Sequence, residues 1–166
     1  MPTILLESEI NSDVKTCFDL ARNIDILKES LKRTNEIPVA GKTSGLIAKG
    51  EWISWEANHF GVVQHLTTKI VAFDSPNYFV NEMVLGVFKS YRHEHIFEEK
   101  GDITIMTDRF IFECPYGILG KLVDWLFMKR YITKLLKSRV KILKFIAESE
   151  NATDYTSPYL SPMREV

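Results

Sequence analysis

A long helical pattern close to the C-terminus constrains this chain more than any other feature. From Ile118 to Glu148 the sequence contains no proline and one glycine, Gly120. Apolar residues recur there at intervals of three and four, which predicts one helix with a broad buried stripe. At 1.5 Å per residue it would be about 45 Å long, so the rest of the chain is expected to fold around it. The stripe comprises Ile118, Leu122, Trp125, Leu126, Tyr131, Ile132, Leu135, Leu136, Val140, Leu143 and Ile146.

The length and composition predict one globular domain. The chain has 166 residues, of which 45% are hydrophobic and 26% charged, enough for a single good core. We expect that domain to span residues 1–148. Residues 149–166 lose periodicity and contain two Ser-Pro steps, so they are expected to form a mobile tail.

No segment has the pattern of a secretion signal, and no window of about 20 apolar residues exists, so stable membrane insertion is not predicted. Cys17 and Cys114 match no metal-binding spacing and are expected to be free thiols in a reducing cytoplasm. No phosphate-binding or other cofactor motif is present, so no cofactor is predicted.

Positive charge is concentrated on the long helix. Residues 118–147 contain eight basic side chains and one acidic one, whereas the whole chain has a net charge of −1. Such a helix could bind an acidic surface or partner, but a solvated outer face explains the pattern more simply. Nucleic acid is not an expected partner, because the whole protein is slightly acidic and no nucleic-acid motif occurs. The basic residues are Lys121, Lys129, Arg130, Lys134, Lys137, Arg139, Lys141 and Lys144.

The remaining elements are predicted to be one strand, two short helices and an antiparallel meander. Alternation predicts a first strand at residues 3–10, and Ser12 is the expected N-cap of a helix that reaches Ala21. A second helix follows at residues 23–32, and a loop is expected at residues 34–45. Further strands are predicted at residues 51–57, 62–73, 78–87, 91–98 and 103–114. This order favours an α+β fold in which a curved antiparallel sheet grips the long helix, leaving space for a ligand.

Several strings of residues carry a resemblance to a known family. They are GEWISWEANHFG at residues 50–61, Gln64 with LTTKI at 66–70, YFVNEM at 78–83, Gly86 with Phe88, HEHIF at 93–97, MTDRF at 106–110 and PYGILGKL at 115–122. In these the chain resembles the START-related helix-grip superfamily, SRPBCC, and within it a subgroup of small bacterial proteins without an assigned activity. The superfamily includes the birch-pollen allergen, lipid-transfer START domains and aromatic polyketide cyclases. The subgroup favours an acidic residue at position 81 and proline at 87, where this chain has Asn81 and Val87.

Alternation along two strands indicates which side chains face the cavity. Tyr91, His93, His95 and Phe97 share one side of their strand. With a four-residue turn at residues 99–102, His93 would lie opposite Asp108 and His95 opposite Met106, at a Cβ separation of about 4.5–5.5 Å. The candidate ligand-binding residues are Trp55, His59, Gln64, Phe79, Tyr91, His93, His95, Met106, Asp108, Phe110 and Trp125.

Three interpretations of His93, His95 and Asp108 remain open. The group could be a buried polar network that stiffens the sheet. His93 and Asp108 could instead be catalytic, with the aspartate orienting the imidazole for proton transfer. A divalent metal such as zinc is a weaker possibility, because the spacing reveals no further firm ligand, and no metal is predicted.

The function expected from this sequence is binding of a small apolar molecule between the sheet and the long helix. The resemblance implies a lipid, an isoprenoid, a polyketide or an aromatic compound. One alternative is an enzyme of cyclase or dehydratase type that uses the His/Asp pair. Another is an interaction module that uses the basic helix and needs no ligand.

Overall fold

The computed structural model describes residues 2–32, 35–59, 62–114, 121–150 and 152–156, and for residues 59 and 121–125 it describes the backbone alone. Seven antiparallel strands form one sheet in the order β1-β7-β6-β5-β4-β3-β2. The strands are β1 (Thr3–Ile10), β2 (Ile37–Gly41), β3 (Trp52–His59), β4 (Val62–Asp74), β5 (Tyr78–Leu85), β6 (Ser90–Lys100) and β7 (Ile103–Glu113). The helices are α1 (Val14–Ala21), α2 (Ile24–Leu31), α3 (Lys121–Ala147) and α4 (Ala152–Thr156).

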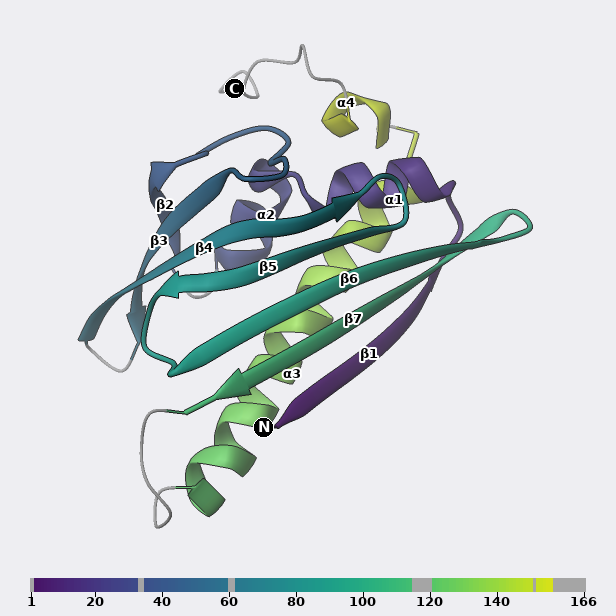
Figure 1. Cartoon of the computed structure of the whole chain (residues 1–166). Coiled ribbons are helices and arrows are strands. Elements are labelled where there is room, and N and C mark those ends of the chain that lie inside the picture. The colour runs from purple at the N-terminus through teal and green to yellow at the C-terminus, as the bar shows by residue number, and fades with distance from the viewer. Residues whose placement is uncertain (1, 33–34, 60–61, 115–120, 151, 157–166) are drawn as a thin grey trace.

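The sheet and the helices form two layers. The sheet curves around α3, which runs diagonally across its inner face, and α1 and α2 cover the same face at one end (Figure 1). Helix α3 packs against α2, α1 and β1. This arrangement confirms the predicted α+β fold with a curved antiparallel sheet, two short helices after the first strand and a long C-terminal helix.

The two short helices begin at side-chain caps. The carboxylate of Asp13 accepts a hydrogen bond from the Thr16 backbone nitrogen at 2.9 Å, so Asp13 and not Ser12 is the N-cap of α1. The side-chain oxygen of Asn23 accepts hydrogen bonds from the backbone nitrogens of Asp25 and Ile26 and caps α2.

Strand β2 lies where the sequence predicted a loop. Pro38 and Gly41 suggested a turn, but β2 is an edge strand, where proline is tolerated because its missing N–H faces outward. The pairing with β3 is irregular between Pro38 and Ala40. Gly41 has φ +77°, and a Cβ there would lie 2.3 Å from the Trp52 carbonyl oxygen. Only glycine therefore fits where the backbone of β2 comes this close to β3.

Helix α4 was not predicted either, because five residues are too short to show periodicity. It packs against α1. The side-chain nitrogen of Asn23 donates a hydrogen bond of 2.6 Å to the Tyr155 carbonyl oxygen, and Ala152 is buried. The mobility of the segment around it stays a prediction.

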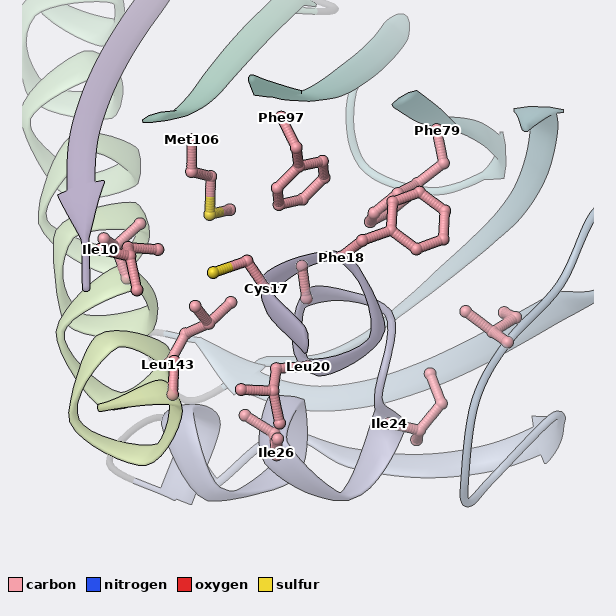
Figure 2. Packing of buried hydrophobic residues seen from close by; sticks show 14 of the residues in the cluster. Ile10, Cys17, Phe18, Leu20, Ile24, Ile26, Phe79, Phe97, Met106 and Leu143 are labelled. Carbon is pink, nitrogen blue, oxygen red and sulfur yellow. The ribbon is translucent and has the colours of Figure 1, made fainter. Parts of the chain in front are cut away.

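The larger hydrophobic core lies beneath α1, at one end of the sheet. Phe18 of α1 is fully buried and contacts Phe79 and Phe97 on the sheet edge to face, with ring centroids 5.5 and 5.6 Å apart (Figure 2). Met106, Ile10 and Leu143 close the same cluster. A second cluster, Ile4, Phe110, Phe112, Ile132 and Leu136, joins the N-terminal half of α3 to β1 and β7.

The predicted stripe of α3 is confirmed from Ile132 onward. Ile132, Leu136, Val140 and Leu143 are buried. Leu126 is 52% exposed, so its assignment to the buried stripe was wrong. The side chains predicted at positions 118, 122 and 125 lie outside those that the structure describes. Among the described residues, no helix is long and apolar enough to cross a membrane.

Candidate functional site

A cavity of about 460 Å³ lies between the sheet and α3, beside the larger core. This volume is within the usual range of small-molecule sites, roughly 300–1,000 Å³. Its wall is mostly apolar: Trp55, Phe79 and Phe110 contribute from the sheet, and Ile24 and Leu27 from α2.

One face of α3 forms the opposite wall. The residues that line the cavity follow a helical period along about 18 Å of the axis, from Phe127 to Arg139. Between these two ends the wall is formed by Met128, Tyr131, Ile132, Leu135 and Leu136. The helix therefore presents a continuous apolar strip to the cavity with one cation, Arg139, at its inner end.

Six of the candidate ligand-binding residues line the cavity: Trp55, Gln64, Phe79, Tyr91, His93 and Phe110. Tyr91 stacks on Phe110 with ring centroids 4.6 Å apart. His95, Met106 and Asp108 were expected to face the cavity, but they are not part of its wall: Met106 belongs to the core beneath α1, and the other two lie behind the wall. The side chains of His59 and Trp125 are outside the described set.

The register between β6 and β7 also differs from the prediction. His95 lies opposite Asp108, His93 opposite Phe110 and Phe97 opposite Met106. The strands are joined by a two-residue turn, with Lys100 paired to Ile103, where the sequence suggested four residues. Gly101, with φ +64°, supplies the positive angle that such a tight turn needs. Shortening the turn by two residues moves the pairing by two positions and keeps each side chain on its predicted face.

His93, His95 and Asp108 nevertheless meet, through a diagonal contact. His93 Nε2 lies 2.8 Å from Asp108 Oδ1 and makes a hydrogen bond to it. His95 Nδ1 lies 2.7 Å from the same oxygen, but it is out of line and has no well-aligned hydrogen-bond partner among the described residues. All three side chains are at most 3% exposed.

Asn81 connects this group to the cavity. It lines the wall, and its side-chain nitrogen lies 3.4 Å from His95 Nε2. Because an amide nitrogen can only donate, His95 Nε2 accepts, and the ring proton belongs on Nδ1, towards Asp108. The imidazole of His95 also stacks on Phe79 at 4.2 Å, which fixes its plane.

Burial and hydrogen bonding set the charge states of the group. Burial lowers the pKa of His93, and the nearby Asp108 carboxylate only partly opposes this effect. Burial and the neighbouring His93 ring together lower the pKa of His95 to about 3. Burial alone would raise the pKa of Asp108, but the contacts from His93 and His95 outweigh it and keep that pKa well below its ordinary value. At neutral pH the group is therefore one carboxylate held by two neutral imidazoles.

The same three side chains could ligate a metal ion. His93, His95 and Asp108 place their ligand atoms within 4.8 Å of one another, and imidazole with carboxylate is a donor set that suits zinc. They are the only such group among the described residues. Asp108 Oδ1 already accepts from His93, and the group is enclosed, so the three side chains fit a buried polar network better than a metal site with an open coordination position.

The charge states predict a loss of stability in mild acid. Unfolded histidine has a pKa of about 6.5, whereas folded His95 takes up a proton only near pH 3. The neutral ring of His95 therefore makes its full contribution to stability above pH 6.5, and this contribution is lost as the pH drops from 6.5 towards 3. Between pH 7 and pH 5, His95 alone should cost about 2 kcal/mol. Urea denaturation at the two pH values measures this loss. A flat profile would contradict the assigned neutral state.

Arg139 is the functional candidate that sequence reasoning missed. It was grouped with the solvated basic face, but it lines the cavity and its Nη2 donates to the Ala21 carbonyl oxygen at 2.6 Å. A signal was present in the sequence, because position 139 lies seven residues after Ile132 and four after Leu135, on the apolar stripe. The predicted exposed basic face is confirmed at Lys134, Lys137 and Lys141, which are all exposed.

Solved structures share this architecture at low sequence identity. The protein TTHA0849 from Thermus thermophilus superposes with a TM-score of 0.67 at 20% identity, over 89% of this chain and all of its own. Major latex-like protein 151 from Panax ginseng matches with a TM-score of 0.61 at 16% identity, over 89% of this chain and 98% of its own. Ara h 8.0201 matches with a TM-score of 0.62 at 14% identity, over 88% and 97%. No family model and no curated protein matches the sequence.

These likenesses, together with the observed topology, define the class of fold. The chain has a helix-grip fold, the α+β arrangement of a curved antiparallel sheet around a long C-terminal helix. It shares that fold with the ginseng major latex-like protein over nearly the whole of both chains.

Proposed function

We propose that this protein binds a small, mainly apolar molecule in the cavity between the sheet and α3. The observation that carries the proposal is the cavity itself, with its volume of about 460 Å³ and its aromatic and aliphatic wall. A few polar groups, among them Gln64, Asn81 and His93, interrupt that wall and could orient a ligand. Lipids, isoprenoids, polyketides and aromatic compounds all have the required character. Cys17 is a buried free thiol, which supports a reducing compartment such as the cytoplasm.

The first test is native mass spectrometry of the protein after gentle purification. A bound apolar molecule of defined mass would support the proposal. Protein that carries no such molecule and also fails to bind a neutral apolar fluorophore, 1-aminoanthracene, would contradict it. That second result would favour an interaction module, for which the exposed lysines of α3 offer a basic surface.

Filling the cavity should abolish binding without unfolding the protein. Ala57 lines the wall from β3, and Ala57→Phe would project a ring into the empty volume. We expect 1-aminoanthracene to bind at least about 10-fold more weakly, with thermal stability maintained because the ring replaces empty space. Val63→Phe places the same ring at a position that is 57% exposed and should change neither property. Unchanged probe affinity in Ala57→Phe would place the ligand elsewhere.

His93 provides a specific reason to consider an enzyme of cyclase or dehydratase type as a second function. It lies on the wall with Nε2 held by Asp108 behind it, so its ring is fixed in orientation. Its lowered pKa keeps it neutral and able to accept a proton from a bound molecule through Nδ1. The test uses the molecule identified by mass spectrometry. Turnover that His93→Gln abolishes while binding is retained would support catalysis, and absence of turnover by the wild type would favour a binding protein.

A further inference from the structure

Arg139 is a partly buried cation that has no partner carboxylate among the described residues. It projects from α3 on the same face as Ile132 and Leu136, and its one hydrogen bond to a described residue goes to the neutral carbonyl oxygen of Ala21. A guanidinium has five N–H donors, so most of its donor capacity remains unused. Since an unpaired charge within a protein is costly, the position requires an explanation.

The second arginine of the cavity wall shows what a satisfied guanidinium looks like here. Arg22 donates two hydrogen bonds to Asp19 Oδ1, from Nε at 2.9 Å and from Nη2 at 2.7 Å, and it also donates to the Ile47 carbonyl oxygen at 3.1 Å. Arg139 makes no ion pair with any described residue. Of the two arginines on the wall, only Arg139 therefore lacks a carboxylate partner among the described residues.

The nearby acidic groups do not supply the missing partner. Asp108 lies close enough to oppose the lowering of the Arg139 pKa by burial, but its carboxylate is already engaged by His93 and His95. Glu36 also lines the cavity, and its charge acts on Tyr91 and Tyr131. Its carboxylate does not form an ion pair with Arg139.

We propose that the ligand of this cavity is an amphipathic monocarboxylate, and that Arg139 binds its carboxylate group. The inference rests on the proposed binding function and names the chemical class of the ligand. A planar guanidinium matches a carboxylate through two parallel hydrogen bonds, which an ammonium group cannot provide. One cation balances one negative charge, so a monocarboxylate suits the site better than a doubly charged phosphate monoester.

Tyr91 supports the same assignment. It lines the cavity, and burial raises its pKa to about 12, an effect that Arg139 opposes, so the two groups are close enough to interact. The hydroxyl therefore stays protonated at neutral pH and can donate a hydrogen bond to an anionic head group. The remainder of the wall is apolar and suits the rest of the ligand.

The two ends of the cavity differ in chemistry, which predicts how the ligand is oriented. Arg139 is at the inner end of the α3 strip, about 18 Å along the helix from Phe127. Phe127 and Val87 also line the cavity, and they are 53% and 43% exposed, so they form an apolar rim. The acidic head belongs at Arg139, with the apolar part extending towards this rim.

The test compares dodecanoic acid with dodecan-1-ol, which has the same chain length and no charge. Each compound is titrated against 1-aminoanthracene bound to the wild type, to Arg139→Met and to Lys137→Met, the last being a matched change on the exposed face of the same helix. Because removing one partner of a buried charge pair costs at least about 2 kcal/mol, Arg139→Met should weaken binding of the acid roughly 30-fold or more. Binding of the alcohol and of the probe should be unchanged in both variants.

The outcomes separate this inference from the proposed function. Equal affinity of the wild type for acid and alcohol would overturn the role of Arg139 while leaving the apolar cavity supported. A preference for the acid that persists in Arg139→Met would also overturn it. If neither compound displaces the probe or the probe does not bind, both proposals fail.

A purely structural arginine at the C-terminal end of α1 is the competing explanation, because cations there are favourable. The stability of the ligand-free protein distinguishes the two. A ligand-binding Arg139 should be replaceable by methionine with no loss in melting temperature, because the variant removes an unpaired buried charge. A marked loss in Arg139→Met, accompanied by equal loss of acid and alcohol binding, would assign Arg139 to structure. Should that variant not fold, Arg139→Gln, which keeps a side-chain N–H donor without the charge, permits the same comparison.

Discussion

Asp108→Ala should lower the free energy of unfolding by about 3–5 kcal/mol, which is enough to unfold a marginally stable domain. Asp108 Oδ1 lies 2.8 Å from His93 Nε2 and 2.7 Å from His95 Nδ1, and none of these side chains is more than 3% exposed. Removal of the carboxylate leaves the buried Nε2–H of His93 without its acceptor and takes away the oxygen that lies 2.7 Å from His95 Nδ1. Equilibrium denaturation in urea measures the effect. Glu99→Ala, at an exposed position of the same hairpin, is the control and should change stability by no more than about 0.5 kcal/mol.

Asp108→Asn then tests whether the network also serves ligand binding. The amide keeps the shape but turns one acceptor into a donor, so a loss of about 1–3 kcal/mol is expected from the unsatisfied contact. Only His93 of the three lies on the cavity wall. A structural network predicts unchanged affinity for 1-aminoanthracene and for dodecanoic acid in this variant. Weaker ligand binding or lost turnover with little loss of stability would instead assign the pair to function.

Phe18→Ala should cost about 3–5 kcal/mol, through lost burial and the cavity left behind. The ring of Phe18 is fully buried and lies against Phe79 and Phe97, with ring centroids 5.5 and 5.6 Å apart (Figure 2). Its centroid also lies 5.2 Å from that of Phe73. These neighbours come from three strands, so the hole cannot close by movement of one side chain. Thermal and urea denaturation both report the loss.

Phe145→Ala is the matched control for this prediction. Phe145 lies on α3 and is 77% exposed, so the same truncation removes little buried surface and should change stability by no more than about 0.5 kcal/mol. Comparable losses for Phe18→Ala and Phe145→Ala would contradict the packing of α1 on the sheet.

The sequence predicted the fold because its strongest signals are local. The helical period of α3 and the alternation of the strands depend on neighbouring residues, and both are confirmed from Ile132 onward and in the meander from β3 to β7. Strand β2 was missed because its status as an edge strand, which makes Pro38 acceptable, depends on pairing with β3. The composition of a segment cannot reveal that pairing.

The candidate site was predicted in part, for a related reason. Alternation placed His93, His95 and Phe97 correctly on the inner face of β6. It could not indicate which element covers each of them, and α1 fills the space over Phe97 whereas the cavity lies over His93. Core and cavity walls have the same apolar composition, so periodicity does not separate them. The register error came from the turn, where two residues suffice because Gly101 adopts a positive φ.

The pairing of the first strand with the last one decides the order in which this chain can be completed during synthesis. Strand β1 has β7 as its only neighbour in the described sheet, and Ile4 faces Phe110, more than a hundred residues later. Until β7 has left the ribosome, β1 has no strand to pair with, although α1 and α2 can already form beside it. Closing such a long loop makes folding slow and leaves apolar surface open in the meantime. The nascent protein should therefore depend on chaperones until α3 emerges and covers the sheet.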